Sequence, residues 1–283
     1  MSRFAYVNGQ YVPQPEASTH IEDRGYQFAD GIYEVIALVK GNFIDFQEHL
    51  DRLDYSLAEL RILSPLSRPA LVHICQEIIR LNRLQDAMIY IQVSRGIAPR
   101  YHSFPKDPRP ILVVTARHVN QRQLMANKAK GVAAITLLDN RWARPDIKSI
   151  SLLPNILSKQ QAEEQGCYEA ILYKPDGTVT EASATNVWIV RKDGVLQTHP
   201  LSQSILGGIT RQRLIGLVQQ NGITVEEKAF SLTELKSAQE VILSASVSGI
   251  TPVTKVDQTV IGDGQPGAIT QKLMKLYLDY TGG

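Results

Sequence analysis

The first part of the chain carries short apolar runs separated by turns, followed by a pattern with the helical period. Apolar residues dominate FAYVNGQYV and IYEVIALVKGNFIDF, and a glycine-containing turn interrupts each run. These runs predict two β-hairpins. Four leucines between Leu50 and Leu60 then share one face of a helix predicted over 47–62, and a second helix is predicted over 68–82. The strands MIYIQVSRG and PILVVTA complete this part.

The second half of the chain mixes hairpins with helices. After the strand VAAITLL, a helix predicted over 151–165 ends at Gly166. Two Asp-Gly hairpins follow, EAILYKPDGTVTEAS and NVWIVRKDGVLQTH. Next come the helix GGITRQRLIGLVQQNG, a short helix that Ser231 would cap, the strand EVILSAS and a C-terminal helix over 267–279.

This order of elements predicts the α+β class. Strands and helices do not alternate regularly, as they would in a doubly wound sheet. A chain of 283 residues is long enough for two modest domains. Polar residues in RHVNQRQLMANKAKG interrupt the pattern, so we predict a small domain over 1–118, a linker over 119–130 and a larger domain over 131–283.

Composition excludes several classes of function. Hydrophobic residues make up 43% of the chain and charged residues 20%, and 30 basic against 28 acidic residues give a net charge of +2. Without a basic stripe we expect no nucleic-acid partner. Without a long apolar run or a signal-like start we expect no membrane partner. The two cysteines, Cys75 and Cys167, have no metal-ligand spacing and no disulfide pattern, which favours a reducing cytoplasm and no metal.

One lysine stands out as candidate chemistry. Lys148 lies in RPDIKSISLLPN, between an acidic residue and a serine-rich turn. Most lysines are solvated surface charges, and residue type alone favours that interpretation. A lysine that forms a Schiff base must be partly desolvated or close to positive charge. Arg141 and Arg144 are close in sequence and would favour a neutral amine.

Two further charges have both a simple and a functional interpretation. Glu181 lies at the end of a predicted strand, so it is either an edge charge in water or a buried anion with a cationic partner. Arg52 borders the apolar face of the 47–62 helix. Its stem would pack along the core with its head in solvent, or its guanidinium would bind an anion such as phosphate.

Two loops could bind anions. In LGGITR, Gly207 and Gly208 precede a helix whose first-turn N–H groups suit a phosphate, although such a glycine pair is more often only a tight turn. In SRGIAPRYHSF, Arg100 and His102 could converge on a carboxylate, and they are equally compatible with exposed loop residues. His102 has no second histidine or cysteine at metal-ligand spacing.

Together these stretches resemble the class IV, or fold-type IV, pyridoxal-phosphate aminotransferases. The resemblance runs from EDRGYQFADGIYEV through HLDRL, PRYHSFP, RWARPDIKSISLLPNILSKQQAEEQGCYEAIL, TVTEASATNVWIV and LGGITR to SASVSGITPV. It implies a small α+β N-terminal domain, a larger C-terminal α+β domain with a pseudo-barrel, and pyridoxal 5′-phosphate between them. It also implies a homodimer.

The resemblance assigns a role to each candidate residue. Lys148 would form the Schiff base with the cofactor and move the proton at the substrate Cα. Glu181 would pair with the pyridine nitrogen, which keeps the ring an electron sink. Leu206 would pack on the ring. The phosphate would be bound by Arg52, Ile209, Thr210 and Ser246.

The same resemblance bears on the substrate. Tyr33, Arg100 and His102 match the residues that clamp the substrate α-carboxylate in the branch acting on D-amino acids. We therefore expect a ping-pong transaminase that moves an amino group from D-amino acids, such as D-alanine, to 2-oxo acids, such as 2-oxoglutarate. Alternatives are a relative acting on branched-chain L-amino acids or R-amines, an aminodeoxychorismate lyase, and a cofactor-binding protein that has lost catalysis.

Overall fold

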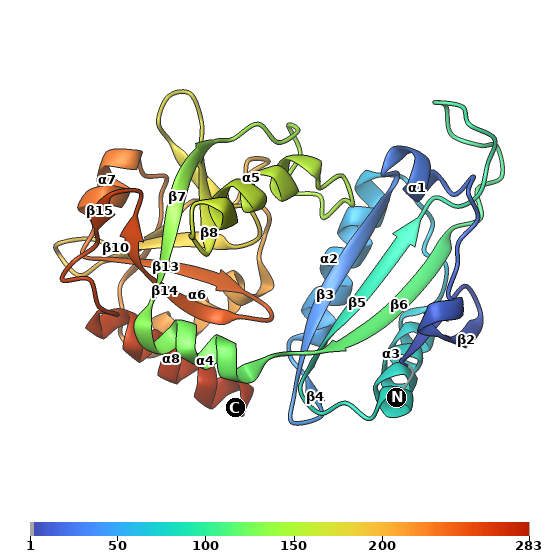
Figure 1. Ribbon diagram of the computed structural model, residues 1–283, viewed down its shortest axis with the longest axis horizontal. Helices are drawn as coiled ribbons and strands as arrows, with labels where there is room; N and C mark the ends of the chain where they lie inside the picture. The colour runs from blue at the N-terminus through green and yellow to red at the C-terminus, as the bar shows by residue number, and fades with distance from the viewer. Residues whose placement is uncertain (1–2, 283) are drawn as a thin grey trace. The chain divides into compact units, whose positions relative to one another are not determined.

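The computed structural model describes residues 3–282, and its chain forms two compact units. The first unit runs to Val119 and also includes Ile147–Ser151. The second unit takes in Asn120–Asp146 and the chain from Leu152 onward. Each unit combines helices with a sheet (Figure 1), which confirms the predicted α+β class.

The first unit is a six-stranded antiparallel sheet covered by two helices. Its strand order is β2-β1-β6-β5-β3-β4. The elements are β1 (Phe4–Val7), β2 (Gln10–Pro13), η1 (Gln14–Glu16), α1 (Arg24–Phe28), β3 (Gly31–Val39), β4 (Asn42–Phe43), α2 (Phe46–Glu59), α3 (Arg68–Asn82), β5 (Ala87–Ser94) and β6 (Ile111–His118).

The core of the first unit lies between its sheet and the helices α2 and α3. Alternate residues of β3, Ile32 and Ile36, point to this side and are fully buried, and Leu50 and Leu53 of α2 pack in the same cluster. Each such aliphatic side chain stabilises the fold by roughly 1.5–3 kcal/mol relative to an exposed one. The alternate position, Tyr33, faces the other side of the sheet and is only half-buried.

The second unit is built on a mixed nine-stranded sheet. Its main strand order is β12-β11-β10-β13-β14-β7-β8-β9, and β15 pairs with β14. The elements are α4 (Gln121–Lys130), β7 (Val132–Leu138), α5 (Leu153–Glu164), β8 (Glu169–Tyr173), β9 (Val179–Ala182), β10 (Asn186–Val190), β11 (Leu196–Thr198), α6 (Ile209–Gln220), β12 (Val225–Glu227), α7 (Leu232–Ser237), β13 (Glu240–Ala245), β14 (Gly249–Val256), β15 (Thr259–Val260) and α8 (Ala268–Thr281).

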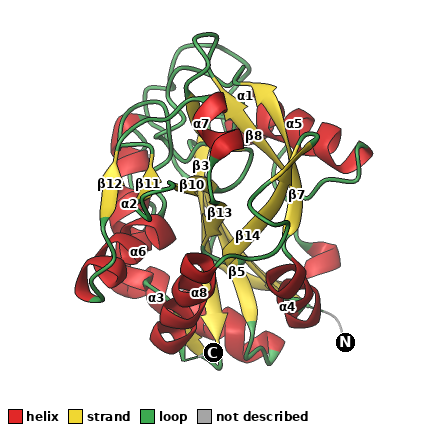
Figure 2. Cartoon of the chain, turned by 90° about the vertical axis from the view of Figure 1, so that its left-hand side faces the viewer, coloured by secondary structure: helices red, strands yellow, loops and turns green. Residues whose placement is uncertain are grey.

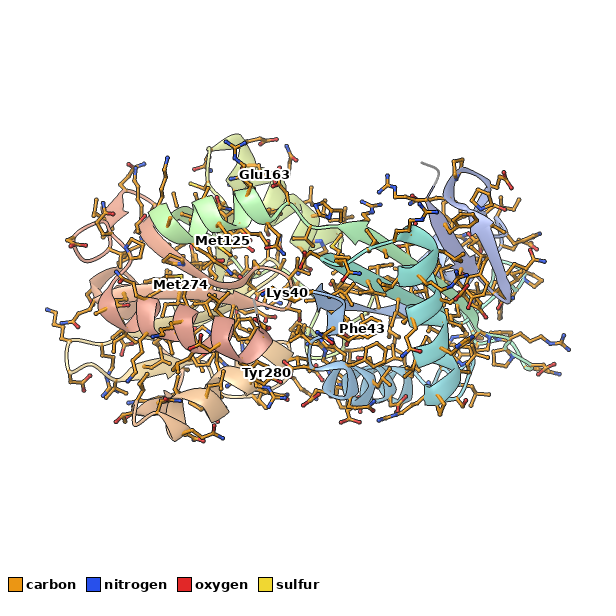
Figure 3. All side chains as sticks on the ribbon, turned by 90° about the horizontal axis from the view of Figure 1, so that it is seen from below. Lys40, Phe43, Met125, Glu163, Met274 and Tyr280 are labelled. Carbon is orange, nitrogen blue, oxygen red and sulfur yellow. The ribbon has the colours of Figure 1, made fainter. Side chains whose placement is uncertain are left out.

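Three buried apolar clusters pack against this second sheet. Helices α6 and α8 lie side by side (Figure 2), and one cluster contains Leu214 of α6, Leu273 of α8 and Trp188 of β10. A second cluster contains Phe230 and Leu235, the latter on α7, and a small third one contains Ala162 of α5. Helices α4 and α8 also both pack against β14, and Figure 3 labels Met125 on α4 and Met274 on α8. Within residues 3–282, none of the helices has the length and apolar character that a membrane span requires.

Most elements lie where the hydrophobic pattern predicts them. At the first hairpin, Asn8 and Gly9 have φ values of 41° and 105°, the left-handed pair that a tight hairpin turn needs. The helix predicted over 47–62 spans Phe46–Glu59, because the chain turns at Arg61, whose φ is 53°. The capping box that Ser231 was predicted to start is also present.

Some elements escaped prediction for identifiable reasons. Helix α4 occupies the segment that we interpreted as a linker, and since it buries no residue it has no apolar stripe to detect. Strand β14 contains Pro252, a residue that argues against a central strand. Helix α1 has five residues, too few to show a helical period.

Candidate functional site

The backbone around Lys148 is fixed along the edge of β3 in the first unit. The Tyr33 N–H donates to the Lys148 carbonyl at 2.9 Å, and the Ile150 N–H donates to the Gly31 carbonyl at 3.0 Å. The Lys148 N–H in turn donates to Ser56 Oγ on α2 at 3.2 Å. Main-chain bonds on both sides of the lysine therefore set the direction of its side chain.

The Lys148 side chain is half-buried, as a reacting lysine requires. Its Nζ lies 4.1 Å from the centroid of the Tyr33 ring. Arg141 and Arg144, which the sequence offered as neighbouring charges, each pair with a carboxylate instead. Arg144 binds Asp146 at 2.8–2.9 Å, and Arg141 binds Asp139 and Glu181.

Arg52 belongs to a buried charged cluster of the first unit. Its Nε donates to Glu34 Oε1 at 2.7 Å and its Nη2 donates to Glu34 Oε2 at 2.8 Å, a two-point pairing. His49 Nδ1 lies 2.7 Å from Glu34 Oε2. Burial raises the pKa of Glu34, but Arg52 and His49 outweigh it and lower that pKa to about 2. The anion holds the Arg52 guanidinium in one orientation.

Arg52 and Lys148 are also connected through α2. Ser56, which accepts from the Lys148 backbone, lies four residues after Arg52, so the two α2 side chains occupy the same face. The structure thus brings together three of the residues predicted from sequence: Lys148, Tyr33 and Arg52.

The loop that carries Arg100 and His102 is anchored at its backbone. Arg24 Nη1 donates to the Tyr101 carbonyl at 2.6 Å, and the same guanidinium reaches the His102 carbonyl at 3.4 Å. Asp30 accepts from Arg24 Nε at 2.8 Å. Burial raises the pKa of Asp30, and its two arginine partners, Arg95 and Arg24, bring it below the usual range. The carboxylate therefore stays charged and keeps Arg24 in place.

Arg100 and His102 themselves are exposed and flank one aromatic ring. The Arg100 guanidinium carbon lies 5.1 Å from the centroid of Phe28, and the His102 ring lies 5.7 Å from it. The structure therefore brings these two residues together. Within residues 3–282, no hydrogen bond or ring contact joins Tyr33 to either of them.

Glu181 is the centre of a buried cluster in the second unit. It is 5% exposed, so the simple interpretation of an edge charge in water is wrong. Arg141 Nη1 and the Leu206 N–H both donate to its Oε1, the latter at 3.0 Å. Asn186 Nδ2 donates to its Oε2 at 2.9 Å. Burial raises the pKa of Glu181 above its usual value, although Arg141 opposes this.

Arg141 is held from behind by a second carboxylate. Its Nε and Nη2 donate to the two oxygens of Asp139 at 2.9 and 2.8 Å. Thr180 Oγ1 also donates to Asp139, at 2.8 Å. Although burial raises the pKa of Asp139, Arg141 lowers it below its usual range. Asp139 thus directs Arg141 toward Glu181.

The start of α6 lies directly beyond Leu206. Asn186 Nδ2 donates to the Leu206 carbonyl at 3.0 Å as well as to Glu181, so it connects the two. A Cβ on Gly208 would lie 1.9 Å from Asn186 Oδ1, and hence only glycine permits this approach. No side chain caps the helix, whose first residues are Ile209 and Thr210. Its first-turn N–H groups have no partner within the helix.

The other predicted phosphate residues lie in the same unit. Thr210 is buried, and its Oγ1 lies 3.5 Å from the Tyr277 hydroxyl. Ser246 lies in the turn between β13 and β14 and is half-buried. The structure joins Glu181, Leu206, Ile209 and Thr210 through consecutive backbone and hydrogen bonds.

Sequence reasoning missed the residues that orient these side chains. A signal existed for Glu34, because an acid interrupts the apolar face that β3 forms with Ile32 and Ile36. No comparable signal existed for Arg141, Asn186 or Arg24. Some of their partners lie far along the chain: Glu181 is 40 positions from Arg141, Tyr101 is 77 positions from Arg24 and Leu206 is 20 positions from Asn186.

The oxygen atoms of Glu181 leave room for one further donor. A carboxylate offers about four acceptor positions, two on each oxygen. Arg141 and Leu206 occupy those of Oε1, and Asn186 occupies one of Oε2. One position therefore remains for the N–H of a protonated ring nitrogen. In the first unit, the half-buried Lys148 and the oriented Arg52 suit the aldehyde and the phosphate of pyridoxal 5′-phosphate. In the second unit, Glu181 and the uncapped start of α6 suit its ring nitrogen and its phosphate, so the residues of each unit fit this cofactor.

Known proteins resemble this chain over nearly its whole length. The family described as amino-transferase class IV matches residues 31–256. A D-alanine aminotransferase of Listeria monocytogenes serotype 1/2a (strain 10403S) is 43% identical over 278 residues, which are 96% of this chain and 94% of the relative. A D-alanine aminotransferase of Bacillus licheniformis is 41% identical over 266 residues, 94% of this chain and 93% of that relative.

Solved structures also resemble this chain over nearly its whole length. A branched-chain amino acid aminotransferase of Escherichia coli superposes with a TM-score of 0.90 at 26% sequence identity, covering 97% of this chain and 93% of that chain. The resemblance inferred from motifs is therefore confirmed, and so is the fold type that it implies.

Proposed function

The chain belongs to the class IV aminotransferase family and is an aminotransferase, and from this premise we propose that its amino donors are D-amino acids. D-alanine is the expected donor and 2-oxoglutarate the expected acceptor, in two successive half-reactions. The observation that carries this proposal is the 43% identity, over 96% of the chain, to a D-alanine aminotransferase.

Pyridoxal 5′-phosphate is the cofactor of this proposal. When bound, it supplies an electron sink that acidifies the substrate Cα–H bond. Lys148 Nζ attaches to the cofactor and later moves the proton at the substrate Cα. The Glu181 carboxylate accepts the N–H of the pyridine nitrogen through the open position on Oε2. The neighbouring Arg141 keeps Glu181 oriented for this contact.

The remaining proposed cofactor contacts concern the phosphate and the ring face. Leu206 packs against the ring, and its N–H at the same time fixes Glu181. Phosphate oxygens are bound by the Arg52 guanidinium and by the start of α6, where helix N–H groups favour an anion. The phosphate-binding residues are Arg52, Ile209, Thr210 and Ser246.

The substrate α-carboxylate is bound, in this proposal, by Tyr33, Arg100 and His102. Arg100 supplies the charge that a carboxylate requires, and its loop is already fixed by Arg24. A carboxylate fixed on one side leaves only one Cα–H directed at Lys148, which is how such a clamp selects one enantiomer.

We further propose that the enzyme is a cytoplasmic homodimer. The first unit exposes large apolar side chains near α1 and the 97–104 loop, which is the usual property of a surface that a protein partner covers. They are Ile21, Tyr26, Ile97, Tyr101 and Phe104. Both cysteines are free thiols, as expected in a reducing compartment.

A second candidate function is transamination of branched-chain L-amino acids. It is favoured by the similarity to a branched-chain amino acid aminotransferase structure, which extends over 97% of this chain. The identity of 26% to that protein is well below the 43% to the D-alanine enzyme, so we place this function second.

A panel of amino donors distinguishes these functions. The purified enzyme with pyridoxal 5′-phosphate is mixed in turn with D-alanine, L-leucine and (R)-1-phenylethylamine, and the visible absorption of the lysine-bound cofactor is followed. We expect D-alanine to deplete this absorption fastest and to give pyruvate when 2-oxoglutarate is the acceptor. Faster depletion by L-leucine would instead establish the second function. Lys148→Ala is the control, and it should lack both the absorption and the turnover.

A further inference from the structure

On one face of the first sheet, three polar side chains lie next to one another, and of these only Tyr33 has a proposed role. Tyr33 on β3 and Gln92 on β5 are directly opposite each other in the antiparallel pairing, and Tyr90 precedes Gln92 by two residues. Opposite residues, and residues two apart, project from the same face. We call Tyr33, Tyr90 and Gln92 the polar row. All three are half-buried, whereas the other face is filled by the core.

The polar row lies beside the lysine to which the proposed function assigns the chemistry. Lys148 Nζ is 4.1 Å from the centroid of the Tyr33 ring. The Tyr90 ring stacks on that same Tyr33 ring, with centroids 5.6 Å apart and planes inclined by 29°. The Tyr33 ring therefore contacts both the Lys148 amine and the Tyr90 ring, which places the polar row next to the lysine.

Tyr90 fixes the orientation of the Gln92 amide. Its hydroxyl donates to Gln92 Oε1 at 2.7 Å. Burial, with Tyr33 adjacent, raises the pKa of Tyr90 to about 12, so this phenol remains a neutral donor near neutral pH. With the oxygen occupied, the amide presents its Nε2 donors. Among residues 3–282, no group accepts from Gln92 Nε2.

We propose that the Gln92 side-chain amide donates a hydrogen bond to the α-carboxylate of the amino-acid substrate, with Tyr90 as the residue that positions it. This proposal rests on the proposed function. Gln92 lies directly across from Tyr33, the hydroxyl assigned to the same carboxylate, and neighbouring donors can share its two oxygens. A neutral amide adds directionality beside the charge that Arg100 supplies.

Three variants test this assignment in the intact holoenzyme. Gln92→Leu removes the donor and should raise the KM for D-alanine and the inhibition constant of propionate by about tenfold each, while kcat changes little. Gln92→Glu places an anion beside the carboxylate and should raise both constants further, with partial recovery as pH falls. Tyr90→Phe keeps the stacked ring and should raise them by a smaller factor.

Further measurements separate substrate binding from a structural effect. The dissociation constant of pyridoxal 5′-phosphate and the thermal midpoint should remain at the wild-type values in all three variants. Thr115→Val is the matched control, because Thr115 lies opposite Tyr90 on the same sheet face and has no proposed role; its KM should not change.

The assignment would be overturned by several results. One is that the KM for D-alanine and the inhibition constant of propionate are unchanged in Gln92→Leu. Another is that this variant loses affinity for the cofactor by the same factor as for the substrate. A third is a KM increase limited to D-glutamate, which would place the contact at the substrate side chain. Failure of the wild-type enzyme to convert D-alanine would contradict the proposed function instead. Propionate binding to the wild-type and Gln92→Leu enzymes would still test the carboxylate contact in that case.

Discussion

Two buried arginine–carboxylate pairs, one in each unit, perform opposite tasks. In the first unit, Glu34 holds Arg52 at two points, and the arginine is the proposed cofactor ligand. In the second unit, Arg141 holds Glu181, and the carboxylate is the proposed ligand. The same type of ion pair thus orients the arginine in the first unit and the carboxylate in the second unit.

The difference between the pairs lies in the pKa of the carboxylate. Arg52 and His49 make three contacts with Glu34 and lower its pKa to about 2, so its charge is stabilised strongly within the protein. Arg141, Leu206 and Asn186 also make three contacts with Glu181, yet burial raises its pKa. Glu34 is therefore an anion stabilised by its own partners, whereas the charge of Glu181 would be stabilised further by one more donor, such as the ring N–H of the proposed cofactor.

The largest effect on stability is expected from removal of Arg141, the arginine of the pair in the second unit. Arg141→Leu would leave Glu181 and Asp139 buried without their cation, which should lower the free energy of unfolding by about 3–5 kcal/mol. Urea unfolding of the apoenzyme measures this. Arg68→Leu is the control, since Arg68 forms exposed pairs and its loss should change stability by less than about 1 kcal/mol. Equal losses in both variants would contradict the buried role of Arg141.

The second-largest effect is expected from acid, which should remove the contribution of the ionised Glu34 carboxylate to the free energy of unfolding. Its pKa of about 2 lies below the ordinary value of 4.5, so the ionised form stabilises the fold fully above about pH 4.5 and loses this contribution as pH falls toward 2. The loss should proceed at about 1.4 kcal/mol per pH unit. Free energies of unfolding of wild type and Glu34→Gln, compared from neutral to acid pH, should converge. A difference that stays constant with pH would refute this.

The smallest effect is expected on cofactor affinity. Glu34→Gln keeps an acceptor near Arg52 but removes the charge and one of the two contacts, so the guanidinium should lose its single orientation. We expect the dissociation constant of pyridoxal 5′-phosphate to rise about tenfold, equivalent to about 1.4 kcal/mol, with kcat retained at saturating cofactor. Titration of the apoenzyme measures it. An unchanged dissociation constant would show that Arg52 needs no anchor.

Residues that could contact a ligand were easier to predict from the sequence than the residues that orient them. Lys148, Glu181 and Arg52 became candidates because motifs place them within short, recognisable stretches. Arg141 could not be paired with Glu181, since 40 residues separate them and only the folded sheet brings them together. Similarly, the hairpin turns were predicted from local backbone requirements, whereas β14, with Pro252, is a strand only because β13 and β7 pair with it on both sides.

The position of Ile147–Ser151 affects how the chain can fold. Residues 148–150 of this segment pair with the edge of β3, although the chain on both sides of the segment belongs to the second unit. During synthesis, the first 119 residues can therefore collapse while this edge of β3 is still unprotected, and an unprotected strand edge can pair with other chains. A fragment that ends at Val119 should show this aggregation tendency, and Lys148, the proposed Schiff-base lysine, reaches its place only when residues 147–151 complete the first unit.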